Sequence, residues 1–339
     1  AENISYLYFP IAGEAGLKSS FTPNLGGDAK IDQNTFLLEP VSAENLVNNR
    51  NSRNFWCNVK GIGSWSLTGH SAEELSKKFT EMQDDSEVTA GFMWQKTTRE
   101  SKKYQLRGEI LSFIPVDKNV EIMLVTITNT GRMAQTVTPT AAIPLYGRSA
   151  DNIRDHRHVT SLLHRIETTD TGVLVTPTLS FDERGHQVNH MTYYCVGWSG
   201  NGEKPVDFYP TAEDFVGEGG NFERPYAIVK NAEGVKAGTK IEGLEAVGGL
   251  HFSEITLEPE EECSYLIFTG ITEDIQEIRN LSKTYTTREK VLEELEKTMD
   301  PAKYTGRASV QVDAFLKNVI NPMLEENKDL LGMTAEINV

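Results

Sequence analysis

Cysteine is scarce in this sequence, and its scarcity restricts the kinds of site that the chain can hold. Only three cysteines, Cys57, Cys195 and Cys263, occur among 339 residues, and no two of them form a CxxC pair. An odd number of widely spaced cysteines argues against both a disulfide framework and a zinc knuckle. Each cysteine lies in or beside an apolar run, so we expect buried, reduced thiols in a cytoplasmic protein.

The sequence also lacks long apolar runs and a surplus of positive charge. No apolar run approaches the ~20 residues of a membrane-spanning helix, and the opening AENISYLYFP lacks the basic and apolar regions of a signal peptide. With 33 basic against 49 acidic residues, the net charge is −16, which disfavours nucleic acid and anionic membranes as partners. We therefore predict a cytoplasmic location, no membrane partner and no nucleic-acid partner.

Helical periodicity is missing from residues 1–272. Short apolar segments occur there instead, separated by turn sequences rich in Gly and Asn. Several of them, including Val120–Thr128 and Ser264–Thr269, are apolar on both faces, as expected of strands that lie between two layers. We therefore predict a mainly β fold, a large antiparallel sandwich over residues 1–272. We expect its four tryptophans in the core and not on a sugar-stacking platform.

The pattern becomes helical over residues 273–339. Thr286 and Glu289 have the spacing of a capping box, and the helix that follows carries apolar residues on one face. Pro322 should kink or end a second helix. The apolar stripe of that helix is too wide to face solvent; it consists of Val312, Phe315, Leu316, Val319, Ile320, Met323 and Leu324. We expect these two helices to need a cover, from either the sandwich or a further domain.

The segment from Gly147 to His190 is unusually rich in arginine and histidine. It holds five of the seven histidines and five arginines, mostly in the blocks GRSADNIRDHRHVTSLLHRI and SFDERGHQVNH. A loop that serves only solubility would favour Lys and Glu, whereas these planar donors suit sugar hydroxyls or phosphate oxygens. Arg154, His156 and His158 would share one face of a strand, and Arg154 and His158 one face of a helix. We therefore predict a carbohydrate-facing surface here.

Two other interpretations of this segment stay open. The arginines could simply neutralise neighbouring acids. His156 and His158 could converge with His186 and His190 on zinc, but the flanking arginines would repel a cation, so we predict no metal. We expect His164 and His251 to be ordinary histidines with satisfied hydrogen bonds.

Four blocks carry a resemblance to a known family. PTAAIPLYGRSADNIRDHRHVTSLLHRI, PTLSFDERGHQVNH, DFVGEGGNFERP and GLEAVGGLHF resemble the N-terminal region of glycoside hydrolase family 94, formerly glycosyltransferase family 36. The opening YFPIAGEAGLKSSFTP and the RNFW…GSWSLTG block are similar to the subgroup acting on β-linked glucans, which includes cellobiose, laminaribiose and 1,2-β-oligoglucan phosphorylases. The resemblance implies a β-supersandwich of the galactose mutarotase type over residues 1–272, followed by a helical linker over residues 273–339.

The same resemblance implies where the chemistry lies. Family members place an (α/α)6 barrel after the linker, and that barrel holds the catalytic acid and most phosphate contacts. No residue here matches that acid, so we expect no catalytic residue, no activity from this chain alone, and no cofactor beyond inorganic phosphate as co-substrate of the complete enzyme. The expected partners are a β-linked gluco-oligosaccharide, a barrel in the same or another chain, and a second copy, since the family's sandwich builds a dimer.

The DERGH block suggests one residue for sugar recognition. Arg184 is placed like the arginine that touches the acceptor sugar in the family, although an ion pair with Asp182 or Glu183 that braces a loop would also explain it. The predicted substrate-binding set is Arg184, Asp182, His186, Arg154, His156, Arg157 and His158. Two alternative functions are a free-standing carbohydrate-binding or assembly protein without the barrel, and a mutarotase-type enzyme that uses His186 or His190 with Glu218.

Overall fold

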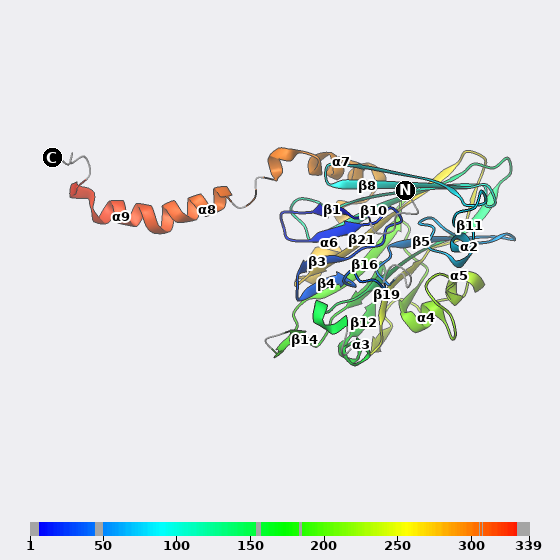
Figure 1. Cartoon of the computed structure of the whole chain (residues 1–339), viewed down its shortest axis with the longest axis horizontal. Coiled ribbons are helices and arrows are strands. Elements are labelled where there is room, and N and C mark those ends of the chain that lie inside the picture. The colour runs from blue at the N-terminus through cyan, green and yellow to red at the C-terminus, as the bar shows by residue number, and fades with distance from the viewer. Residues whose placement is uncertain are drawn as a thin grey trace. The chain divides into compact units, whose positions relative to one another are not determined.

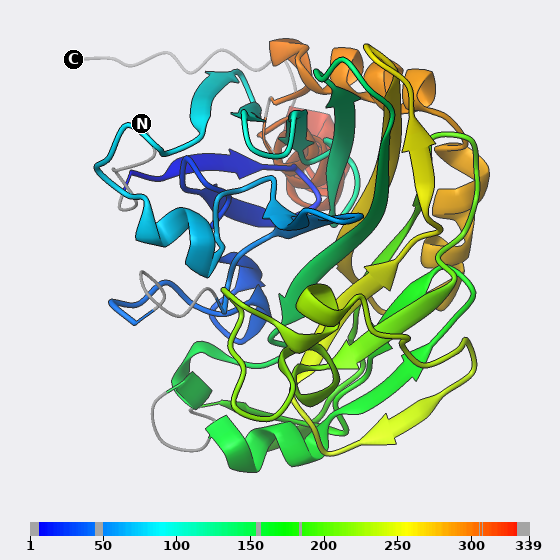
Figure 2. The same ribbon diagram turned by 90° about the vertical axis from the view of Figure 1, so that its right-hand side faces the viewer.

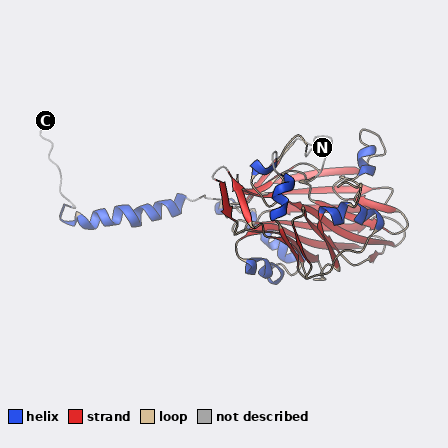
Figure 3. Cartoon of the chain, turned by 90° about the horizontal axis from the view of Figure 1, so that it is seen from below, coloured by secondary structure: helices blue, strands red, loops and turns tan. Residues whose placement is uncertain are grey.

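The computed structural model describes residues 7–44, 50–153, 157–182, 185–304, 306 and 308–330, with the backbone alone at 157, 158, 181, 182 and 330. The chain divides into two compact units, Ala1–Met299 and Asp300–Val339 (Figure 1). Strands dominate the first unit, and helices make up the described part of the second (Figure 3). No helix within these described ranges is both long and apolar enough to span a membrane.

Two large antiparallel sheets and one small one dominate the described part of the first unit. The largest sheet has nine strands in the order β18-β12-β13-β16-β21-β10-β9-β8-β7, with the bounds Lys240–Glu242, Arg165–Thr168, Gly172–Val175, Thr192–Ser199, Glu262–Thr272, Val120–Asn129, Leu106–Phe113, Trp94–Ser101 and Asp85–Gly91. The second has the order β17-β19-β11-β5-β6 with β20 beside β11, with the bounds Asp207–Thr211, Ala246–His251, Gln135–Leu145, Asn54–Val59, Gly63–Ser66 and Ile255–Leu257. The small N-terminal sheet joins β1 to β4 in chain order, over Phe9–Ala12, Lys18–Phe21, Ala29–Asp32 and Thr35–Leu38.

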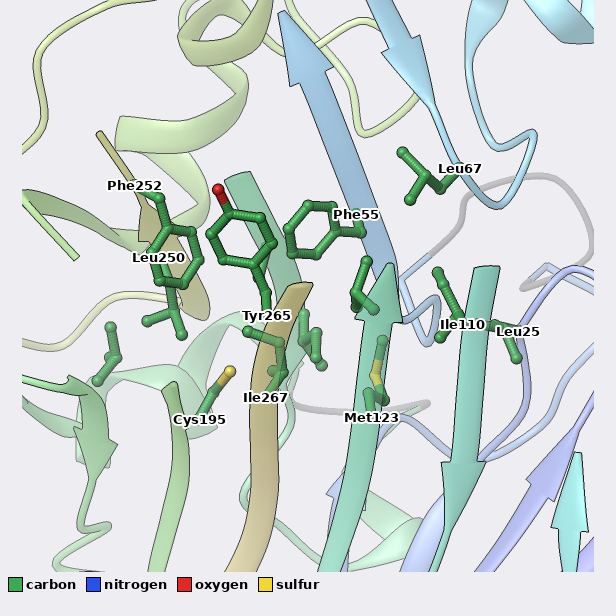
Figure 4. Packing of buried hydrophobic residues seen from close by; sticks show 14 of the residues in the cluster. Leu25, Phe55, Leu67, Ile110, Met123, Cys195, Leu250, Phe252, Tyr265 and Ile267 are labelled. Carbon is green, nitrogen blue, oxygen red and sulfur yellow. The ribbon is translucent and has the colours of Figure 1, made fainter. Parts of the chain in front are cut away.

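The main hydrophobic core lies between the two large sheets. Phe55 and Leu250 of the six-stranded sheet face Met123, Tyr265 and Ile267 of the nine-stranded sheet, and all five side chains are buried (Figure 4). Burial of apolar side chains from two facing sheets is what holds a β-sandwich together. The predicted antiparallel sandwich is confirmed.

Helices α6 (Ile275–Thr284) and α7 (Arg288–Thr298) cover the outer face of the nine-stranded sheet (Figure 2). Their inward side chains are buried against it, and Trp198 Nε1 donates to the Tyr285 carbonyl at 3.0 Å. This explains why every residue of β10 and β16 is buried. The strands end at Thr272, as the sequence predicts, but the first compact unit continues to Met299 because these two helices pack on it.

The described part of the second unit is mainly helical. It begins with η3 (Pro301–Lys303), and α8 (Ala308–Phe315), the π-helical η4 (Leu316–Ile320) and α9 (Asn321–Glu326) follow, with η5 (Lys328–Leu330) after them. The helix does not end at Pro322. Instead, the backbone widens to a π-helix directly before the proline, whose ring and missing N–H do not fit regular α-helical bonding. Most of the predicted apolar stripe, including Phe315 and Met323, is exposed.

Short helices α4 (Ala212–Val216) and α5 (Tyr226–Lys230) lie on the outer face of the six-stranded sheet (Figure 1). Phe215 and Ile228 pack there against Trp56 and Tyr209. As predicted, the tryptophans belong to the core: Trp56, Trp65 and Trp198 are buried, and Trp94 packs partly buried beneath the helices on the other face.

Candidate functional site

The structure brings the two Arg- and His-rich blocks together. The segment starts directly after β11 and passes through η1 (Ala150–Ile153), α3 (Arg157–Thr160) and η2 (Ser161–Leu163). After β12 and β13 it forms a separate hairpin of β14 (Leu179–Asp182) and β15 (Gly185–Val188). Both α3 and β14 contact η1. The described residues of 147–166 and of 179–190, which β13 separates in sequence, therefore share one region of the first unit.

Most of the predicted sugar-binding residues fall outside the described side chains. Arg154, His156 and Arg184 lie outside the described residues, as does Glu183. Arg157 and His158 begin α3 and Asp182 ends β14, described by their backbone alone. His186 is exposed on β15, opposite Phe181. The predicted set of seven thus stays a prediction, although its described members lie in the shared region.

The metal and mutarotase alternatives gain no support. Across the described ranges, no group of three or more His, Cys, Asp or Glu side chains could hold a metal ion. His186, His190 and Glu218 are all exposed. An exposed trio does not form the enclosed, water-excluding cleft that an acid–base pair requires.

The structure adds a cluster at the base of this segment, which we call the polar junction: the buried Tyr146, Arg148 and His164, with the partly exposed Glu245. Leu145 of β11 pairs with Ala246 of β19, so the residues just beyond these strand ends lie at one edge of the sheet. There Arg148 Nη2 donates to Glu245 Oε2 at 2.8 Å. An isolated bridge between Arg148 and Phe36 ties this edge to the N-terminal sheet.

Arg148 and His164 each have buried polar atoms without a hydrogen-bond partner among the described residues. The guanidinium of Arg148 lies 5.0 Å from the centre of the Tyr146 ring, and its Nε and Nη1 are buried without a partner among the described residues. His164 is fully buried, with Nδ1 at 3.2 Å from the Leu244 carbonyl oxygen and Nε2 likewise unpaired in the described part. His251 has the same pattern, with Nδ1 bonded and Nε2 without a partner among the described residues, so the expectation of fully satisfied histidines stays a prediction for both. Sequence reasoning could not assign Glu245 to Arg148, since 97 residues separate them.

Burial sets the charge of this junction. Loss of solvent, followed by the nearby positive charge of Arg148, lowers the pKa of His164 from 6.5 to about 3. His164 is therefore neutral at physiological pH and cannot act there as a general acid. Gly147, at φ +61°, passes so close that a Cβ would lie 3.4 Å from His164 Nε2. The junction thus offers fixed hydrogen-bond donors and one positive charge, without acid–base chemistry.

The junction is too tight to hold a sugar by itself. The adjoining recess, lined by Glu39, Arg50, Tyr146, Phe222 and Glu245 among others, has room for about one water molecule. Arg148 therefore fits the interpretation in which arginine neutralises a neighbouring acid. We infer that the junction supports the base of the segment, while any ligand would contact the outer residues of the segment.

Larger recesses lie elsewhere on the first unit. One of about 360 Å³ is lined by residues such as Glu203, Glu254 and Cys263. Another of about 330 Å³ lies between α6 and the turn before β10, with Lys118 and Tyr194 in its wall. Neither contains a predicted site residue. Volumes of this order are at the lower end of those of small-molecule sites.

Comparison with known proteins identifies the sandwich. A family model described as the glycosyl hydrolase 94 supersandwich domain matches residues 38–288. Similar solved structures include a bacterial glucoamylase bound to acarbose (9% identity, TM-score 0.48, 84% of this chain and 35% of that one). A candidate kojibiose phosphorylase from the human microbiome (8%, 0.38, 88% and 36%) and a galactose mutarotase-like protein from Clostridium acetobutylicum (8%, 0.37, 78% and 94%) are also similar. No curated protein sequence matches the chain.

Proposed function

The chain belongs to glycosyl hydrolase family 94 through its supersandwich domain, and from that premise we propose that it serves an inverting phosphorylase of β-linked glucans or disaccharides. In this proposal the sandwich supplies acceptor-sugar recognition and dimer contacts, and a separate (α/α)6 barrel performs the reaction with inorganic phosphate. The family match over residues 38–288 carries the proposal. It spans both large sheets, the Arg- and His-rich segment and helix α6.

The described carboxylates support a non-catalytic role for the sandwich. Inverting phosphorolysis needs a carboxylic acid that protonates the glycosidic oxygen while phosphate attacks the opposite face of the sugar. Such an acid must stand in a site that excludes water and still admits a sugar. Four carboxylates are deeply buried among the described residues. Glu39 adjoins the recess that has room for about one water molecule, which is too small for a sugar. Of the other three, Glu121 is bonded to Arg53, Glu74 to Arg99, and Asp207 to His251. These three acids bind cationic or imidazole side chains within the fold and do not face a sugar site.

The acceptor-sugar role is proposed for the hairpin β14–β15 and its neighbour η1. Arg184, which is outside the described residues, lies between β14 and β15 in sequence, and a guanidinium could donate two parallel bonds to vicinal sugar hydroxyls. His186 is exposed on the adjoining strand. A hairpin outside the main sheets can change its contacts with a ligand without disturbing the core.

Dimer contacts are proposed for the same region because apolar side chains are exposed there. Val159 of α3, Leu162 of η2 and Val188 of β15 are 44%, 60% and 65% exposed. Exposed apolar side chains that gather in one region are typical of protein contact surfaces. A second copy of the chain would cover them and would bring two such hairpins close to one interface.

The test is phosphorolysis, measured as glucose 1-phosphate release from cellobiose, laminaribiose and sophorose oligomers. We expect no release from this chain alone and release after a family 94 barrel polypeptide is added. Release from the chain alone would contradict the proposal. Sugar binding without release in the presence of the barrel would instead favour a free-standing carbohydrate-binding protein.

A further inference from the structure

Four side chains form a row across the outer face of the six-stranded sheet, away from the candidate site. Asp207 of β17 pairs with His251 of β19, His251 with Thr140 of β11, and Thr140 with Trp56 of β5. Directly paired residues on neighbouring strands point to the same face of a sheet. The row therefore lies on the face that carries α4 and α5 (Figure 1). All four residues are buried.

Asp207 fixes the orientation and the tautomer of His251. His251 Nδ1 lies 2.6 Å from Asp207 Oδ1, and the Tyr209 hydroxyl is 3.3 Å from the same nitrogen. The carboxylate is an acceptor, so the proton of a neutral imidazole belongs on Nδ1, which leaves Nε2 as an acceptor. The two ring nitrogens point in nearly opposite directions. With Nδ1 held on the β17 side, Nε2 lies on the side of the ring away from β17.

Two polar atoms in this row are buried without a partner among the described residues: His251 Nε2 and Trp56 Nε1. One is an acceptor and the other a donor. Buried polar groups in folded proteins are almost always hydrogen-bonded, to protein or to ordered water. The two residues are two strands apart, roughly 10 Å between backbones, and Thr140 is the residue of the intervening strand that pairs with both of them.

We propose that one water molecule is specifically bound above Thr140, between these two side chains. It accepts a hydrogen bond from Trp56 Nε1, donates one to His251 Nε2 and uses its remaining capacity on the Thr140 hydroxyl. About three hydrogen bonds is the usual number for a buried water. A ligand that must both donate and accept excludes a metal cation, which cannot accept from the indole, and a simple anion, which cannot donate to the imidazole.

This water would complete a polar layer beneath α4 and α5. The Tyr209 hydroxyl donates to the carbonyl of Ala232, just beyond α5, and also faces the His251 ring. Asp207, His251, the water and Trp56 then form a continuous chain of hydrogen bonds from β17 to β5. Such a chain links strands that are not neighbours, which backbone bonds within a sheet cannot do. This inference is independent of the proposed phosphorylase function.

The test is a double-mutant cycle with Trp56→Phe and His251→Asn, measured by urea unfolding. Asn keeps a donor for Asp207 in the place of Nδ1 and deletes the Nε2 end. Packing losses are the same in both backgrounds and cancel in the cycle. A shared water predicts non-additivity on the order of tenfold in the unfolding equilibrium constant, equivalent to about 1.4 kcal/mol. Separated residues without a shared partner should be additive within about twofold.

His164→Asn is the matched control. His164 is also a buried histidine with an unpaired Nε2 among the described residues, but it belongs to the polar junction. Its cycle with Trp56→Phe should be additive. Additivity in the His251 cycle as well would overturn the proposal, as would equal coupling in both cycles.

A second measurement protects the test if Trp56→Phe does not fold. Thr140→Val removes one hydroxyl at nearly constant volume, and its cycle with His251→Asn should show the same sign of coupling. A high-resolution crystal structure of the chain should show one ordered oxygen within about 3.2 Å of both Trp56 Nε1 and His251 Nε2. Well-ordered density without that oxygen would refute the water site.

Discussion

Removing the charge of Glu121 should destabilise the first unit strongly, because it leaves the buried guanidinium of Arg53 without a counter-charge. Arg53 Nε and Nη2 donate to the two carboxylate oxygens of Glu121 at 2.6 and 3.0 Å. The side chains are 0% and 1% exposed. The remaining N–H groups of Arg53 donate to backbone carbonyls of residues 26–28, and the Ser19 hydroxyl donates to Glu121. This network holds the N-terminal sheet and its loops on β10.

The expected loss of unfolding free energy depends on the environment that the substitution leaves around the Arg53 guanidinium. In Glu121→Gln the amide occupies the same place, but the buried positive charge of Arg53 has no counter-charge. Breaking one side of a buried ion pair typically costs about 3–5 kcal/mol. Part of this cost is the repulsion between the Arg53 donors and the new amide donor, which faces at least one of them. We therefore expect a loss of about 3–5 kcal/mol in the free energy of unfolding.

Urea unfolding of Glu121→Gln beside Glu254→Gln measures this effect. Glu254 pairs with Lys60 at 3.2 Å, but the two side chains are 49% and 69% exposed. An exposed pair contributes about 0–1 kcal/mol, so the control measures what loss of an exposed ion pair costs, and any additional loss in Glu121→Gln is due to burial. Equal m-values would show that the same two states are compared. If both variants lose the same free energy, the reasoning from burial is refuted.

Three further predictions follow from other features. Burial lowers the pKa of His164 to about 3, against 6.5 in the unfolded chain. The unfolded chain therefore takes up the proton first, and the free energy of unfolding should fall as the pH drops from 6.5 toward 3. In urea unfolding, a His164→Asn variant should lose less stability over that range, and parallel pH curves for the two proteins would contradict this. In an enzyme reconstituted with a barrel, Arg184→Ala should raise the KM for the acceptor in reverse synthesis about tenfold or more, since one bidentate contact is lost. Circular dichroism should show that the fold is intact. Unchanged kinetics with every acceptor would contradict the role of Arg184 in acceptor binding. The exposed apolar stripe of α8–α9 should make the chain self-associate, so Phe315→Glu should lower the sedimentation coefficient at high concentration. A parent chain that is already monomeric would contradict this prediction.

The sandwich could be predicted from the sequence because its strands carry a strong local signal. Val120–Asn129 is apolar on both faces, and the structure buries all of it between the core and α7. The change from strand to helix after Thr272 could equally be predicted, because the apolar residues take up a helical period there. The packing of α6 and α7 on the sheet could not be deduced, because an apolar helix face identifies the need for a cover and not which surface provides it.

The expected capping box shows the limit of local motifs. The spacing of Thr286 and Glu289 predicts that Thr286 caps the helix, yet α7 begins after Thr287 and no side-chain cap bond forms there. Tertiary contacts at Tyr285, whose ring is buried against Phe268, fix the chain just before the helix. Packing therefore sets the start of α7 more strongly than a cap, whose contribution is about 1 kcal/mol.

The candidate site was predictable as a region but not residue by residue. An Arg- and His-rich segment indicates polar recognition, but composition does not distinguish a side chain that meets a ligand from one that supports the segment. Arg148 and His164 are buried in the polar junction with Glu245, a partner that only the β11–β19 pairing brings near. The local enrichment therefore overstates the binding surface by including its support.

This division of roles makes the two halves of the segment separable by experiment. Tyr146, Arg148 and His164 of the polar junction are buried, so their substitution should change the free energy of unfolding. An exposed contact such as His186 should instead change sugar affinity and leave unfolding unaltered. Substituting Arg148 removes a buried positive charge and the 2.8 Å ion pair with Glu245, which is only partly exposed. If the segment is a carbohydrate-facing surface on a structural base, stability and affinity must respond to different residues; a single residue that controlled both equally would mean that the base itself holds the ligand.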